Sequence, residues 1–382
     1  MVTTPPFLHE TLPLITQALA QHAEQVDLSG EFPSAAFAKL QQQGLLHFAL
    51  PSSAGGSGGD LLACQAIIQA VARGEPSAAL ILIMQYLNTR RLGTESSWPE
   101  QVRLRVADSV VTKGALINAL RVEPELGTPA RGGLPATRAR RTHAGWRISG
   151  EKIYSTGSYG LSWFLVWASS DDVDPLVGGY LVPADAPGIK IVDEWDHLGM
   201  RGTCSHRVVL DDVLVPLDHA VNVAPWSKPK MGLDEEESVW MAVLLGSLYD
   251  AIAQSARDWF INFLQQRVPT HLGAPLSSLP RFHELVGRID TLLLTNQTLL
   301  NATARGLVAS GHAAQIKQVV TENAIKAVEL MVENIGNHAL TRRHPLQRHF
   351  RNVLCGRIHT PQGDAIFTSV GKLALSVERS TS

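Results

Sequence analysis

The hydrophobic pattern of this 382-residue chain changes its period twice, and this change constrains the fold more than any other feature. From about residue 115 onward, apolar residues recur at every second position, in short runs separated by glycine, proline and aspartate. Such runs are typical of β-strands. We expect strands over 146–149, 164–167, 179–183, 189–192 and 207–210. About 100 residues of this kind predict an antiparallel β-domain, too small for a doubly wound parallel sheet.

Both flanking regions follow a helical period instead. Upstream, apolar residues from Leu61 to Val71 recur at helical spacing after a glycine-rich turn, and Ser77 is expected to be the N-cap of a second helix. Downstream, helices are predicted over 237–266, 280–310 and 313–335.

The predicted fold class is therefore α+β, with three domains. We expect an N-terminal α-helical domain over residues 1–115 and a middle antiparallel, β-barrel-like domain over residues 116–222. A C-terminal four-helix bundle is expected over residues 233–382.

The composition excludes several classes of function. The net charge of −2 offers no broad basic field for nucleic acid or anionic lipid. The three cysteines are far apart and odd in number, so we expect neither a disulfide framework nor a metal site. The N-terminus lacks the pattern of a signal peptide, and no uninterrupted apolar run reaches about 18 residues. We therefore expect no membrane span and a cytoplasmic location.

Two motifs in the β-domain combine an aromatic residue, hydroxyl groups and glycines, as a flat ring with polar edges requires. They are Lys152-Ile-Tyr-Ser-Thr-Gly157 and Leu198-Gly-Met-Arg-Gly-Thr203. Taken alone, the first motif also fits an ordinary hairpin. Together with the order of the domains, the motifs resemble the flavin-binding β-domain of the acyl-CoA dehydrogenase superfamily. The resemblance implies bound FAD or FMN, with cofactor contacts from Tyr154, Ser155, Thr156, Arg201, Thr203 and Ser205.

Weaker matches extend the resemblance along the chain. Gly127 and Thr128 end a partial match over residues 121–128, where relatives contact the pyrimidine side of the flavin. Arg267 resembles an arginine that reaches the cofactor pyrophosphate of a neighbouring subunit, although it also fits the basic end of a helix. Gly336 stands where the family has a glycine-rich turn on the adenine side.

The C-terminal segment lacks the catalytic glutamate of ordinary acyl-CoA dehydrogenases. At the aligned position stands Thr360, which is not a useful base at neutral pH. His359, directly before it, resembles the histidine of the flavin monooxygenase branch, which includes dibenzothiophene monooxygenase. We therefore expect a reduced-flavin, two-component monooxygenase that acts through a C4a-hydroperoxyflavin. Its catalytic residue would be His359, titrating near neutral pH.

Three alternatives remain open. Some relatives carry the glutamate on an earlier helix, and Glu236 falls near that register, which would give an acyl-CoA dehydrogenase that desaturates an acyl-CoA. The acidic run at 234–237 also fits the first turn of a helix. The turn at 55–59 matches the nucleophile elbow of hydrolases, but no buried strand precedes it. A non-catalytic protein with the flavin-binding fold is the last alternative.

The resemblance also implies partners. Family members are tetramers whose flavin sites are shared between subunits, so we expect a homotetramer. A monooxygenase of this branch acts on a small-molecule substrate and receives reduced flavin from a separate reductase. An aromatic, heteroaromatic or organosulfur substrate is suggested by analogy alone.

Overall fold

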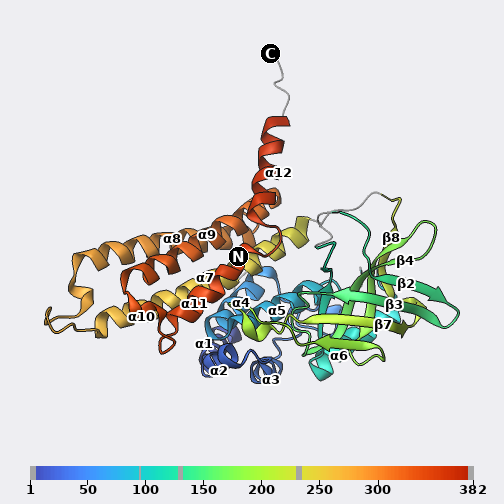
Figure 1. Cartoon of the computed structure of the whole chain (residues 1–382), viewed down its shortest axis with the longest axis horizontal. Helices are drawn as coiled ribbons and strands as arrows, with labels where there is room; N and C mark the ends of the chain where they lie inside the picture. The colour runs from blue at the N-terminus through green and yellow to red at the C-terminus, as the bar shows by residue number, and fades with distance from the viewer. Residues whose placement is uncertain (1–5, 94–95, 128–131, 229–234, 377–382) are drawn as a thin grey trace, which may run out of the picture.

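The computed structural model describes residues 6–93, 96–127, 132–228 and 235–376. Helices from the two ends of the chain lie side by side, and the β-sheet packs at one end of the elongated molecule (Figure 1). The order of helices, strands and helices confirms the α+β prediction.

The N-terminal region consists of helices in the part of the chain that the structure describes. They are α1 (Pro6–Ala20), α2 (Ala23–Ser29), α3 (Ser34–Gln42), α4 (Leu61–Gly74), α5 (Pro76–Thr89) and α6 (Glu100–Lys113). Most residues of α4 and α5 are buried, because α4 packs between α1 and α7 while α5 packs against α4, α7 and β1. They therefore form the centre of the molecule.

The prediction that Ser77 is the N-cap of α5 is wrong. Glu75 takes that position, and its carboxylate accepts a hydrogen bond from the Ser77 amide at 2.8 Å. Pro76 is the first helical residue, where the missing N–H of proline costs nothing. Burial raises the pKa of Glu75 to about 7, so this carboxyl group is an unusual cap.

An eight-stranded sheet follows the helices. Its strands are β1 (Leu116–Leu120), β2 (Arg138–Thr142), β3 (Gly145–Lys152), β4 (Leu161–Ser170), β5 (Leu176–Pro183), β6 (Ile189–Val192), β7 (Arg207–Val215) and β8 (Ala220–Pro225). The strand order is β6-β7-β3-β2-β4-β5-β8, with β1 beside β4. The five predicted strands are confirmed as β3 to β7.

The prediction of a purely antiparallel sheet is wrong at β4. This strand runs parallel to both β1 and β2, whereas the other pairings between named strands are antiparallel. The chain returns to β4 through a long connection rather than a hairpin, and such a connection permits parallel pairing.

The C-terminal region packs four helices against one another: α7 (Glu235–Gln266), α8 (Pro280–Ala304), α9 (Ala313–Asn334) and α11 (Leu346–Leu354). The short helix α10 (Asn337–Leu340) precedes α11, and α12 (Gly363–Ser376) projects from the body in Figure 1. The helix predicted to reach residue 310 ends at Ala304, because Gly306 adopts a left-handed φ of 68° that stops α8.

One described helix, α7, is long and apolar enough to cross a membrane by length and composition. Its apolar window is 78% buried inside the protein, against α4, α5, α8, α9 and α11. We therefore interpret α7 as the core helix of the fold.

Candidate active site

Thr156 stands at the end of a chain of hydroxyl groups. It follows β3 in a turn whose Gly157 amide donates to the Thr203 carbonyl at 2.7 Å. The Ser205 hydroxyl donates to Thr156 Oγ1 at 3.1 Å, and Thr203 Oγ1 lies 2.9 Å from Ser205 Oγ. Because a hydroxyl donates one hydrogen bond, this order leaves the Thr156 hydrogen available to an outside acceptor. The fold thus brings the two sequence motifs together, with buried Thr203 and Ser205 supporting Thr156.

Tyr154 presents an exposed aromatic ring two residues before this threonine. Its backbone has a left-handed φ of 54°, and 55% of the residue is exposed. The ring meets Trp195 and His197 edge-on, and these two rings stack on each other with centroids 3.5 Å apart. An open aromatic face beside a free hydroxyl donor fits a flavin ring and its polar edge.

Ser155 lies differently from its two neighbours. Its side chain is buried, and Oγ donates to the Lys152 carbonyl at 3.4 Å. Its backbone is engaged as well, because its N–H donates to the His206 carbonyl at 3.3 Å and its carbonyl accepts from the Ser158 amide at 3.0 Å. A cofactor contact from Ser155 stays a prediction.

A buried ion pair, which the sequence analysis missed, joins two of the motifs. Lys152 Nζ donates to Glu123 Oε1 at 2.6 Å, and the same carboxylate accepts from the Thr137 amide at 3.0 Å. Although burial alone would raise it, these hydrogen bonds hold the pKa of Glu123 below its usual value. The pair fixes the turn that ends at Gly127, where φ is 69°, onto β3. Thr128 lies outside the described residues.

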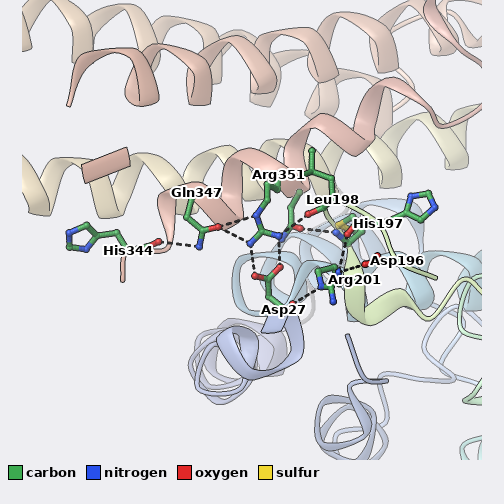
Figure 2. A network of polar contacts seen from close by, with 10 residues as sticks. Asp27, Asp196, His197, Leu198, Arg201, His344, Gln347 and Arg351 are labelled. Atoms are coloured by element: carbon green, nitrogen blue, oxygen red, sulfur yellow. Dashed lines mark hydrogen bonds and ion pairs between the residues drawn. The ribbon is translucent and has the colours of Figure 1, made fainter. Parts of the chain in front are cut away.

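Arg201 holds its own segment against the N-terminal helices. Its Nε donates to the Asp27 carbonyl at 2.8 Å, and its Nη1 donates to Asp196 Oδ1 at 3.0 Å and to the His197 carbonyl at 3.3 Å (Figure 2). The guanidinium is thus engaged within the chain. A cofactor contact from Arg201 stays a prediction.

His359 lies between α11 and α12, half-buried, with its ring fixed from α7. Its Nδ1 is 2.6 Å from the Tyr249 hydroxyl. Lys317 of α9 donates to the carbonyl oxygens of His359, at 2.6 Å, and Pro361, at 3.1 Å. These contacts hold the segment that carries the imidazole against two helices of the bundle.

The charge state of His359 differs from the sequence expectation. Burial and the nearby Lys317 ammonium lower the pKa of His359 to about 4, and burial lowers the pKa of Lys317 to about 8. The imidazole is therefore neutral at pH 7, which corrects the expectation that it titrates near neutrality. A neutral ring offers one N–H donor and one acceptor.

Glu236, the alternative base, lies in the first turn of α7 with 70% of its side chain exposed. It forms an ion pair with Arg90 at 3.1 Å, and the Arg90 guanidinium lies 5.1 Å from the centroid of the Trp240 ring. This environment is that of an acidic residue at a helix N-terminus.

Arg267 and Gly336 lie at the other end of α7. The rings of Phe263 and His338 are 5.2 Å apart, which places the end of α7 beside α10, whose N-cap is Gly336. In Figure 1 this end of the bundle is far from β3, the strand that ends two residues before Tyr154. A single chain therefore does not bring Arg267 and Gly336 to the Thr156 cluster.

Three family models match the chain: the N-terminal domain of acyl-CoA dehydrogenase over residues 9–96, the middle domain over 121–213 and the C-terminal domain over 245–362. The Bacillus subtilis protein YdbM, whose name describes it as an acyl-CoA dehydrogenase, is 30% identical to this chain over 364 residues. The match covers 94% of this chain and 93% of YdbM. The chain belongs to the acyl-CoA dehydrogenase family. Its homologues are flavin-dependent enzymes, and neighbours of the same fold have been solved with bound FMN.

Members of the acyl-CoA dehydrogenase family differ in the reaction their names describe. The L-evernosamine nitrososynthase of Micromonospora is 27% identical over 393 residues, which cover 94% of this chain and 88% of that protein. KijD3, solved with FMN and a dTDP-linked amino sugar, has the same fold, with a TM-score of 0.82, 24% identity and coverage of 100% of this chain and 97% of KijD3. Membership of the family therefore leaves the reaction to be argued from the site.

Proposed function

We propose that this family member is a reduced-flavin monooxygenase acting on a small organic molecule. The observation that carries the proposal is the segment after α11, where Thr360 follows His359 and the His359 ring is fixed by Tyr249. Threonine supplies no base at neutral pH, so abstraction of an α-proton from a thioester lacks a catalyst at this position. Reduced flavin, delivered by a separate reductase, would supply electrons and the centre at which dioxygen is activated.

The hydrogen bond to Tyr249 supports one tautomer of His359. Burial raises the pKa of Tyr249 well above its usual value, so the phenol keeps its proton. The buried hydroxyl has no other acceptor among the described residues, and a buried O–H needs one. Tyr249 would therefore donate to Nδ1, leaving the hydrogen of His359 on Nε2. An N–H donor on the outer nitrogen suits a site that must deliver or hold a proton during oxygen transfer.

The second candidate is an acyl-CoA dehydrogenase with Glu236 as its base. The similarity to YdbM favours this reading. The exposure of Glu236 and its pairing with Arg90 speak against it, because a base that removes an α-proton needs a shielded site.

We also propose a homotetramer in which Arg267 and Gly336 complete the flavin site of a neighbouring subunit. Both lie remote from the Thr156 cluster of their own chain, as described above. Apolar residues that a lone subunit leaves exposed support the assembly. They are Leu294 on α8, Val319 on α9, and Phe367, Leu373 and Leu375 on α12.

The deciding experiment uses the protein with reduced flavin bound. This complex is mixed rapidly with dioxygen, and the flavin absorbance is followed over time. A monooxygenase should give a transient whose spectrum is neither that of reduced nor that of oxidised flavin. Anaerobic bleaching of the oxidised flavin by simple acyl-CoA thioesters would overturn the proposal in favour of the dehydrogenase.

A further inference from the structure

A basic cavity of about 670 Å³ lies where the three regions of the chain meet. The end of α1 and α2 form one wall, the segment 196–201 of the β-domain forms the second, and the stretch 342–351 at the start of α11 forms the third (Figure 2). A cavity of this volume has the size of a small-molecule site.

Two arginines hold these walls in place. Arg351 Nη1 donates to Asp27 Oδ1 at 2.9 Å and to the Leu198 carbonyl at 2.8 Å, and its Nε donates to Gln347 Oε1 at 3.0 Å. Arg201 is engaged by Asp27 and Asp196, as described above. Because these contacts link all three walls, the cavity is shaped before a ligand enters.

Three further arginines line the cavity without such engagement. The guanidinium groups of Arg342, Arg343 and Arg348 have no hydrogen-bond acceptor or ion-pair partner among the described residues. The lining holds five arginines but only three carboxylates. Positive charge in a concave site attracts an anion, and guanidinium forks pair most specifically with the oxygens of phosphate.

The cavity also offers apolar surface. Leu28 on α2 is 52% exposed and Leu198 on the second wall is 63% exposed, and both line the cavity. We propose that this cavity binds a small organic phosphate, with its phosphoryl oxygens held by Arg342, Arg343 and Arg348 and its organic part against the two leucines. Three guanidinium groups that each pair in a bidentate way offer about six donors, more than the roughly four lone-pair sites of a carboxylate, which favours a phosphate or diphosphate. The proposal is independent of the reaction at His359.

Binding of ADP to the flavin-loaded protein, measured by equilibrium dialysis, tests this site. The wild-type protein should bind ADP and should not bind adenosine under the same conditions. The double variant Arg342→Gln/Arg343→Gln and the single variant Arg348→Gln should each weaken ADP binding at least about tenfold, because each removes charge-assisted hydrogen bonds. A competition experiment with pyrophosphate then shows which part of ADP is recognised. If pyrophosphate competes as well as ADP, the phosphoryl groups alone are recognised, and if it competes more weakly, the organic part contributes. Either result supports the site.

The matched control is Arg288→Gln/Arg305→Gln, which removes two exposed arginines on and directly after α8, outside the cavity. It should leave ADP binding unchanged, and far-ultraviolet circular dichroism should show all variants folded. Three outcomes would overturn the proposal: no ADP binding by the wild type, equal loss in the control, or displacement of bound flavin by ADP, which would assign the affinity to the cofactor site instead.

Discussion

The Tyr249 hydroxyl lies 2.6 Å from Nδ1 of His359, although the two residues are 110 positions apart in the chain. Tyr249 is on the core helix α7, so the position of the imidazole is set by a largely buried helix of the bundle rather than by its own loop alone. Lys317 adds a second restraint through the carbonyl oxygens on either side of Thr360. Catalytic groups are typically fixed in this way, by a rigid scaffold beneath a short connecting segment.

Replacing His359 separates the two candidate reactions. For a monooxygenase, we expect His359→Ala to retain flavin binding and to lower the oxygenation rate about 10²–10⁴-fold, the usual contribution of a positioned acid–base group. Glu236→Gln should change that rate little, because its exposed carboxylate only pairs with Arg90. Single-turnover rates measure both variants. The opposite pattern, with loss of anaerobic flavin bleaching by acyl-CoA in Glu236→Gln alone, would identify a dehydrogenase.

The pH dependence of oxygenation should reflect the low pKa of His359. With that pKa at about 4, the imidazole is neutral from about pH 5 upward, so its contribution to the rate should stay constant across neutrality and fall as the pH drops through about 4. The ratio of wild-type to His359→Ala rates, measured from pH 5 to 8, should therefore be flat. A change in this ratio centred near pH 6.5 would contradict the assigned environment.

Tyr249→Phe should lower activity without affecting flavin affinity. The variant removes the donor to Nδ1 and frees the imidazole to change tautomer, so we expect a loss of roughly tenfold in oxygenation and about 1 kcal/mol of stability. Tyr86→Phe is the matched control, because Tyr86 is equally buried and its hydroxyl donates to a backbone carbonyl, that of Leu45, at 2.7 Å. If both variants lose activity alike, Tyr249 acts on stability and not on His359.

Glu75 should make the stability of the protein depend on pH. Its folded pKa, raised to about 7 from a usual value of 4.5, means that the folded state binds the proton more tightly than the unfolded state. This contribution is present in full below the unfolded pKa and is lost as the pH rises through about 7. Glu75→Gln keeps an oxygen for the Ser77 amide but does not titrate. We therefore compare the free energies of unfolding in urea at pH 5, 6 and 8. Between pH 5 and pH 8 the free energy of unfolding of the variant should rise relative to that of the wild type by up to about 3 kcal/mol. A difference between the two proteins that stays constant with pH would refute the raised pKa.

The oligomeric state tests the shared flavin site. Light scattering at micromolar concentration should give a tetramer, and Arg267→Gln should weaken flavin binding while leaving the tetramer intact, because the guanidinium would contact the cofactor and not the interface core. A monodisperse monomer that binds flavin normally would contradict the proposed sharing.

Short-range patterns in the sequence predicted much of this fold. The five strands from β3 to β7 follow alternating apolar residues, and α7 and α9 follow helical spacing. The parallel pairing of β4 was missed because alternation does not specify which neighbour a strand meets. The end of α8 was missed because a single glycine, Gly306, decides it through its φ angle.

The candidate site was predictable only in part. The motifs indicated Tyr154 and Thr156, whose surroundings fit a flavin, and the absent glutamate drew attention to His359. No local pattern pointed to Tyr249 or Lys317, because their role arises from packing between distant helices. The Lys152–Glu123 ion pair could have been suspected from one weak signal in the sequence. A lysine stands in the first flavin motif at the end of an expected strand, where its charge would need a partner. The low pKa of His359 could not be foreseen, since it depends on burial and on an ammonium 42 positions away.

The position of Arg351 bears on the construction of hybrid enzymes from this family. This one side chain bonds the Asp27 carboxylate in the N-terminal helices and the Leu198 carbonyl in the β-domain. The Leu198 partner is a backbone carbonyl that any β-domain of this fold can supply, whereas the Asp27 partner is a side chain. A chimera whose N-terminal helices lacked an acid at position 27 would leave the partly buried charge of Arg351 uncompensated. Domain boundaries alone are therefore an incomplete guide to crossover points. A stable hybrid should inherit α2 and α11 from one parent, or from two parents that both carry the Asp27–Arg351 pair.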